Sequence, residues 1–150
     1  MTAQLPTIST LYDTDYCLWI EITLNQLRCD RVSEIDIHNL IEELEDMGNS
    51  QKDALESNLR VLLMHLLKYK YQSSKRSNSW LYTIREHRKR ILKAFKKSPS
   101  LKNYYHSVFD ESYQDGRELA ADETGLKIET FPAQCPFSQD DILNPDYLPE

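Results

Sequence analysis

The chain has 150 residues, of which 40% are apolar, 28% are charged and three are glycine, and its formal net charge is −6. A chain of this size and composition predicts one compact soluble domain, and it excludes collagen-like, mucin-like and disordered proteins. So few glycines also argue against a glycine-rich phosphate-binding loop.

The first half of the chain predicts three helices. The first covers residues 13–29, because Asp13 is a good N-cap and apolar residues follow it at helical spacing. The second covers 36–47 and ends at Gly48, a natural C-terminal stop. A third helix of about two dozen residues starts near residue 50, and its unusually wide apolar surface is typical of the central helix of a bundle.

The second half predicts two more helices after a Ser-rich loop at 72–78. A fourth helix covers 79–97, and its apolar side is expected to be held by the rest of the chain, through Ile84, Ile91 and Phe95. Ser98-Pro99 is a strong helix start, with serine as the cap and proline at the first helical position. The fifth helix then runs to about Thr124 and ends at Gly125.

The pattern changes from Leu126 onward, where four of the six prolines lie among aromatic and aliphatic residues. We expect an extended strap that docks on the helices, with one short helix at 138–143, because a free tail would be poorer in aromatics. The predicted fold class is therefore all-α, a five-helix bundle with an extended Pro-rich C-terminal strap. We expect a single helical domain over 1–150, with its core at 12–125 and its strap at 126–150.

Several short blocks, taken in their order, resemble a known bacterial family. They include Leu11-Tyr12-Asp13-Thr14-Asp15-Tyr16, then Leu40-Ile41-Glu42-Glu43-Leu44-Glu45-Asp46-Met47-Gly48, and finally Pro145-Asp146-Tyr147-Leu148-Pro149-Glu150. The sequence is similar over nearly its whole length to the family catalogued as domain of unknown function 29. The resemblance implies an all-helical fold and no established activity, so no catalytic residue is carried over from it.

Charge is distributed very unevenly along the chain. Residues 68–97 hold eleven basic residues and one acid, a net +10, whereas residues 1–67 and 98–150 carry −8 each. In one interpretation this basic block binds the phosphates of a nucleic acid. The candidate nucleic-acid-binding residues are then Lys75, Arg76, Arg85, Arg88, Lys89 and Lys93, and the aromatic residues that could stack on bases are Tyr69, Tyr71, Trp80 and Tyr82.

In the other interpretation, the acidic helices of this chain or of a partner neutralise the basic block. Charged helix faces are ordinarily solvated and internally balanced, and the acidic flanks would repel a long nucleic acid. These two arguments favour neutralisation, and both interpretations stay open.

One candidate catalytic pair stands on the third helix. Arg60 and His65 form the R-x4-H motif of helical HEPN ribonucleases, in which a histidine that titrates near neutrality and an arginine act on RNA. Such a match arises readily by chance, and Arg31 with His38 fits another permitted spacing. The structural alternative pairs Arg60 with Glu56 on the helix surface and leaves His65 at the edge of the core.

No metal site and no cofactor are predicted. The four histidines fall on different helices, and none follows an acidic residue at the spacing of di-iron bundles. Three cysteines without a C-x-x-C pair indicate reduced thiols, and hence a cytoplasmic protein. No apolar run approaches the roughly 20 residues that a membrane-spanning helix needs.

The functional prediction is a non-enzymatic helical protein–protein interaction module of a bacterial cytoplasmic protein. It would self-associate or bind another protein through its charged faces. The alternative is a nucleic-acid-directed protein that binds phosphates through the basic block 68–97, in the form of a HEPN-like ribonuclease or a toxin–antitoxin component. Whether the protein is an enzyme stays open.

Overall fold

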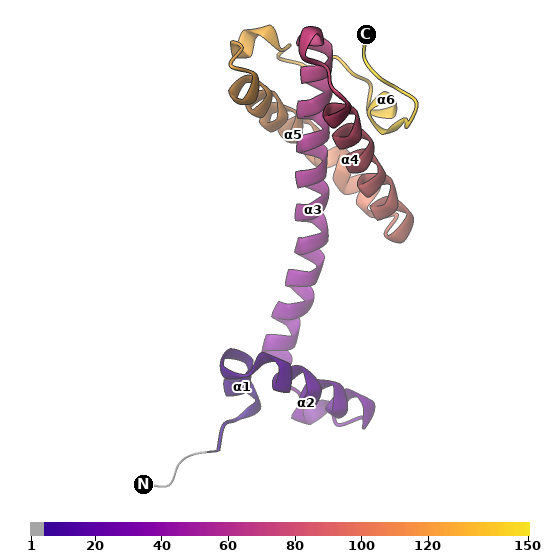
Figure 1. Ribbon diagram of the computed structural model, residues 1–150. Coiled ribbons are helices and arrows are strands. Elements are labelled where there is room, and N and C mark those ends of the chain that lie inside the picture. The colour runs from indigo at the N-terminus through magenta and orange to yellow at the C-terminus, as the bar shows by residue number, and fades with distance from the viewer. Residues whose placement is uncertain (1–4) are drawn as a thin grey trace. The chain divides into compact units, whose positions relative to one another are not determined.

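The computed structural model describes residues 5–150 and contains helices but no strand in that range. The helices are α1 (Ile8–Thr14), α2 (Tyr16–Arg28), α3 (Ile37–Tyr71), α4 (Asn78–Lys97), α5 (Leu101–Thr124) and α6 (Gln139–Leu143) (Figure 1). The all-α prediction is confirmed. By their contacts the residues divide into two compact units, unit 1 up to Asn49 and unit 2 from Ser50 onward, so the single domain over 1–150 stays a prediction.

The helix expected over 13–29 is in fact two helices that meet at Asp15. The backbone of Asp15 is extended, with φ −150°, and its amide donates to Leu11 O at 2.7 Å, which closes α1. Its side chain accepts from the Leu18 amide at 3.2 Å, which opens α2. Asp13, the expected cap, lies inside α1, because Thr7 caps that helix nearly two turns before Asp13.

The second and third expected helices are one continuous helix, α3, of 35 residues. Gly48 does not end it: its φ is not positive, and a Cβ built there would meet no atom within 4 Å. The physical reason is that an interior glycine costs a helix only about 1 kcal/mol. Extending an existing helix through one weak residue is cheaper than nucleating a second one.

The remaining helix ends were predicted more closely. Ser77 caps α4 by accepting from the Trp80 amide at 3.3 Å, two residues before the expected start. The fifth helix begins at Leu101 rather than at Pro99, and the amide of Leu101 donates to Ser98 O at 3.0 Å. Gly125 ends α5 in the left-handed conformation, with φ 72°, as expected.

The core of unit 2 surrounds the C-terminal half of α3, where six leucines are fully buried: Leu55, Leu59, Leu62, Leu63, Leu66 and Leu67. The apolar side of α4 packs against this core through Ile84, Ile91 and Phe95, as predicted. At Gly116, α5 approaches α3 so closely that a Cβ would lie 3.1 Å from Arg60 O and from Leu63 Cβ. Glycine at 116 therefore allows the two helices to cross at short distance.

The C-terminal strap docks on the other helices of unit 2, as expected, and its helix α6 is capped by Ser138, the first residue of the short helix expected there. Phe131, Phe137 and Ile142 are buried in the core. Because the strap is not part of a sheet, its backbone carbonyls need other donors. Side chains of α5 supply them: Arg117 Nε donates to Phe131 O at 2.9 Å and Tyr113 Oη donates to Pro132 O at 2.5 Å.

Unit 1 is held together by hydrogen bonds from aromatic side chains to two acidic residues, Glu43 of α3 and Asp36 just before α3. Tyr12 and Tyr16 each donate to one oxygen of Glu43, at 2.7 and 2.5 Å. Trp19, which is buried, donates from Nε1 to Asp36 at 3.1 Å. The hydrogen bonds from Tyr16 and Tyr12 lower the pKa of Glu43 below its ordinary value.

The continuity of α3 predicts that Gly48→Ala stabilises the protein. Alanine has the higher helix propensity and meets no neighbour there, so we expect a gain of up to about 1 kcal/mol, measured as a higher midpoint of thermal unfolding by circular dichroism. The control is Gly125→Ala, which places a Cβ at positive φ and is expected to destabilise by a similar amount. Destabilisation by Gly48→Ala would show that the helix breaks at 48.

The double donation to Glu43 predicts that its pKa rises when both tyrosines become phenylalanine. Because the pKa is lowered in the folded state, the stabilisation by ionised Glu43 is present above the ordinary glutamate pKa. It is lost as the pH falls through the lowered value. An NMR titration of the Glu43 carboxyl in the double variant should show the rise, whereas Tyr82→Phe in unit 2 should leave the titration unchanged. An unaltered titration in the double variant would contradict the two hydrogen bonds.

Candidate functional site

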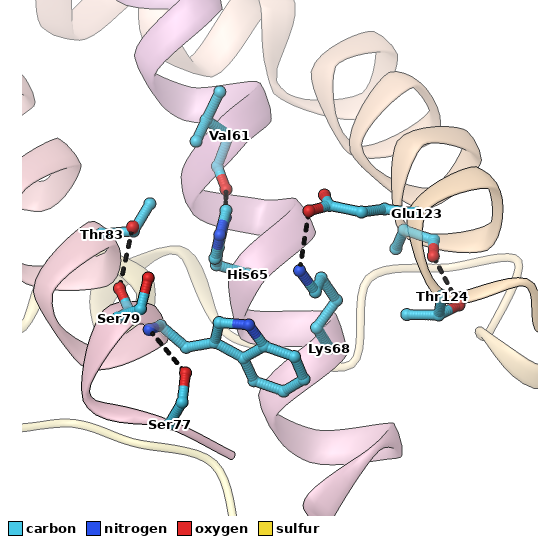
Figure 2. Close-up of polar contacts among 10 residues, drawn as sticks. Val61, His65, Lys68, Ser77, Ser79, Thr83, Glu123 and Thr124 are labelled. Carbon is cyan, nitrogen blue, oxygen red and sulfur yellow. Dashed lines mark hydrogen bonds and ion pairs between the residues drawn. The ribbon is translucent and has the colours of Figure 1, made fainter. Parts of the chain in front are cut away.

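The candidate catalytic residues Arg60 and His65 both lie on α3 within unit 2. His65 is 9% exposed, and its Nδ1 lies 3.0 Å from Val61 O, one turn back on the same helix (Figure 2). Burial lowers the pKa of His65, and the positive charge of Lys68 acts in the same direction, so the neutral imidazole is favoured at pH 7. His65 thus lies at the edge of the core, with one ring nitrogen against the backbone of its own helix.

Beside His65 lies a lysine that is buried although it carries charge. Lys68 is 4% exposed, and its Nζ contacts Glu123 of α5 at 3.1 Å (Figure 2). Its Nζ also lies 4.5 Å from the centre of the Trp80 ring on α4. A buried ammonium needs such partners, and this one joins three helices of unit 2. Glu123 and Trp80 thus account for the burial of the Lys68 ammonium within unit 2.

Arg76 and Lys75, at the start of the basic block, have different environments. Arg76 Nε donates to Tyr69 O at 2.7 Å, and its guanidinium lies 4.1 Å from the centre of the Tyr69 ring. Lys75 is exposed at the end of a short helical turn, Ser73–Lys75. Arg76 therefore fixes the turn after α3, and one face of Tyr69 is covered by it.

Four of the candidate nucleic-acid-binding residues line one groove on unit 2, three of them exposed and the fourth, Arg88, buried. Arg85, Lys89 and Lys93 are exposed there together with Lys96, at spacings of four, four and three residues along α4. Such spacing places all four on one side of the helix. The groove, here called the cationic groove, has a volume of about 420 Å³ and is lined by Arg85, Arg88, Lys89, Leu92, Lys93, Lys96 and Pro145.

The sixth candidate, Arg88, is buried, with 3% of its surface exposed. Its Nε donates to Ile142 O at 2.7 Å, in the last turn of α6, and one terminal nitrogen donates to Tyr147 O at 3.1 Å. The other terminal nitrogen lies 3.5 Å from Pro145 O. Arg88 thus ties α4 to the strap, whose helix α6 lies beside α4 in Figure 1. The sequence alone did not distinguish Arg88 from its exposed neighbours.

Direct pairing offsets little of the basic block. Among residues 5–150, one ion pair joins the block to its acidic flanks, that of Lys68 with Glu123. Arg90 pairs with Glu86, the one acid inside the block, at 3.2 Å. The four cations of the cationic groove form no ion pair within the described residues. The neutralisation that the sequence favoured is therefore not provided by ion pairs at this groove.

A second notable surface lies on unit 1, along the N-terminal part of α3. Four large apolar side chains are exposed there by 46–64%, at spacings of four, three and three residues: Ile37, Ile41, Leu44 and Met47. Glu42, Glu45 and Asp46 are exposed beside them on the same helix. We call these seven residues the acidic-apolar surface. A row of exposed apolar side chains with a polar border is typical of a protein interaction site.

Each of the four histidines contacts a different group. His38 is exposed and lies 3.7 Å from Glu42, His87 Nδ1 contacts Thr83 O at 2.9 Å, and His106 contacts Gln139 at 2.5 Å. Within the described part of the chain no group of three or more His, Cys, Asp or Glu residues is placed to hold a metal ion. In that same part, no helix has the length and apolar character that crossing a membrane requires.

The fold and these surfaces define an all-helical protein with two separate exposed surfaces of opposite charge. A family model matches residues 11–148, and its description reads Domain of unknown function DUF29. The chain belongs to this family, which confirms the resemblance noted in its sequence. Neither the curated proteins nor the solved structures contain a match to it.

The burial of Arg88 predicts that Arg88→Met releases the end of the strap. Methionine fills similar space but leaves the carbonyls of Ile142 and Tyr147 without donors, so we expect a loss of about 2–3 kcal/mol. Thermal unfolding should show the loss, and limited proteolysis with chymotrypsin should cut sooner within residues 139–150. Arg85→Met, an exposed change one turn earlier, is the control. If the two variants behave alike, Arg88 does not hold the strap.

Proposed function

We propose that the chain is a non-enzymatic helical interaction module that binds a protein partner through the acidic-apolar surface of unit 1. The observation that carries this proposal is the exposure of four large apolar side chains in one helical row. Burying such a side chain completely from full exposure is worth roughly 1.5–3 kcal/mol, and these four, which are 46–64% exposed, would contribute about half of that each when a partner covers them.

The chemistry of the surface specifies the partner. Spacings of four and three residues over about three turns match the apolar row of a second amphipathic helix. At about 3.6 residues per turn, the exposed carboxylates of Glu45 and Glu42 lie beyond the Ile41 edge of this row, where lysine or arginine on the facing border of the partner complements them. The partner is therefore an amphipathic helix with a basic border, supplied by another protein.

Charge argues against a second copy of this chain as the occupant. Two copies of the acidic-apolar surface placed together would bring carboxylates against carboxylates. The described residues do contain one basic amphipathic helix, α4, but its apolar side is buried in unit 2 through Ile84, Ile91 and Phe95. Self-association of the acidic-apolar surface therefore lacks a complementary element.

The alternative of a nucleic-acid-directed protein has weaker support. Of the aromatics expected to stack on bases, Trp80 lies against Lys68, Tyr71 packs on Phe131, and one face of Tyr69 is covered by Arg76. For a HEPN-like ribonuclease, the burial of His65 and its contact with Val61 O favour a structural role. These observations support the interaction module over a composite ribonuclease site.

The proposal is tested with two synthetic 18-residue helical peptides that carry leucines at heptad positions. One has lysines on both borders of the leucine row, and the other has glutamates. We expect the basic peptide alone to bind, as measured by fluorescence anisotropy. Its affinity should fall at least tenfold in the double variant Ile41→Glu plus Leu44→Glu, because two apolar contacts are lost and two carboxylates are added.

The matched control is Tyr82→Glu, a charge change at an exposed aromatic residue of α4 in unit 2, which should leave binding unaltered. Equal binding of the two peptides, or full binding by the double variant, would refute the proposal. A dimer that appears in sedimentation of the wild type and disappears in the double variant would identify a second copy as the occupant instead.

A further inference from the structure

The cationic groove on unit 2 has features of a ligand site that the interaction proposal does not use. It lies between α4 and the strap, because Pro145 lines it opposite the residues of α4. Its volume, about 420 Å³, falls within the roughly 300–1,000 Å³ of small-molecule sites. The walls are fixed, since the hydrogen bonds of Arg88 to Ile142 O and Tyr147 O hold the strap against α4.

The charge of the groove is positive and uncompensated. Arg85, Lys89, Lys93 and Lys96 line it, and no acidic side chain does. Arg88, behind them, is a buried cation whose partners are backbone carbonyls rather than a carboxylate, so its charge is not cancelled. Several cations around one concave site attract an anion that carries more than a single charge.

The rest of the lining is aliphatic. Leu92 lies between the cations on α4, and Pro145 faces it from the strap. No aromatic side chain lines the groove, so a base would find nothing to stack on. The site therefore suits a molecule with an aliphatic part and a multiply charged head. A phosphate monoester carries about −1.5 to −2 at pH 7, whereas a carboxylate carries only −1.

We propose that the cationic groove binds an organic phosphate, with the phosphate on the cations of α4 and an aliphatic chain on Leu92 and Pro145. The surface involved belongs to unit 2 and shares no residue with the acidic-apolar surface. This inference is therefore independent of the proposed protein partner, and either can fail without the other.

The probe is octyl phosphate, used below its micelle concentration and titrated calorimetrically into the full chain. We expect it to bind at least tenfold more tightly than inorganic phosphate, because burying even two methylenes corresponds to about that factor. We also expect it to bind more tightly than octanoate, which has the same kind of chain and less charge. Equal affinity for octyl phosphate and inorganic phosphate would overturn the proposal.

Two variants distinguish the residues that bind the phosphate from the residue that contacts the aliphatic part of the ligand. Lys89→Ala plus Lys93→Ala should weaken octyl phosphate about tenfold, whereas the matched control Lys102→Ala plus Lys127→Ala, which removes two exposed lysines elsewhere, should not. Leu92→Ser should weaken octyl phosphate and leave inorganic phosphate unchanged. If the control pair weakens binding as much as the groove pair, the effect is one of net charge and the proposal fails.

Two further probes distinguish other sources of phosphate. Vesicles that contain phosphatidic acid should compete with octyl phosphate only to the extent that they release monomeric lipid. If the protein sediments with these vesicles but does not bind octyl phosphate, its cations contact a membrane surface rather than a ligand in the groove, and the proposal fails. A 12-residue oligouridine that binds more tightly than octyl phosphate, and loses affinity in the Lys89/Lys93 variant, would assign the cations to nucleic acid and overturn the proposal.

Discussion

The requirement to cover the C-terminal part of α3 organises unit 2. From Leu62 to Lys68 every residue of this helix is buried, and a helix that is apolar around most of its circumference is stable in water only when neighbours surround it. The apolar sides of α4 and α5 supply part of this cover, and the strap supplies the rest through Phe131, Phe137 and Ile142. The close crossing at Gly116 follows from the same demand, because α5 approaches the backbone of α3 directly.

This cover brings cations into the interior, where they are satisfied without many acids. Lys68 is held by one carboxylate and one indole ring, and Arg88 by carbonyls of the strap. As a result the acids of α5 are largely left facing solvent, and the exposed cations of the cationic groove have no ion pair within residues 5–150. The cationic groove thus results from the way in which the buried cations Lys68 and Arg88 are satisfied. A sequence count of charges does not reveal it.

The sequence predicts those features that depend on local periodicity. The all-α class, the buried side of α4, the docking of the strap and the stop at Gly125 all follow from residue spacing and turn chemistry, and the structure confirms them. The sequence predicts a helix end at Gly48 that is absent, because glycine also occurs inside helices. It does not predict the break at Asp15, because the nearby Asp13 is an equally good cap. It also treats Arg88 like Arg85, although only tertiary contacts with Ile142 and Tyr147 distinguish the two.

The exposure of every residue from 44 to 54 divides α3 into stretches of unequal local stability. Short helical stretches that bury nothing are marginal in water, so these turns open with a small free energy, whereas those from 55 to 67 open only when the core does. Backbone amides of one uninterrupted helix would then exchange with solvent on widely separated timescales. The one continuous helix α3 thus consists, in its local stability, of a labile segment joined to a protected one.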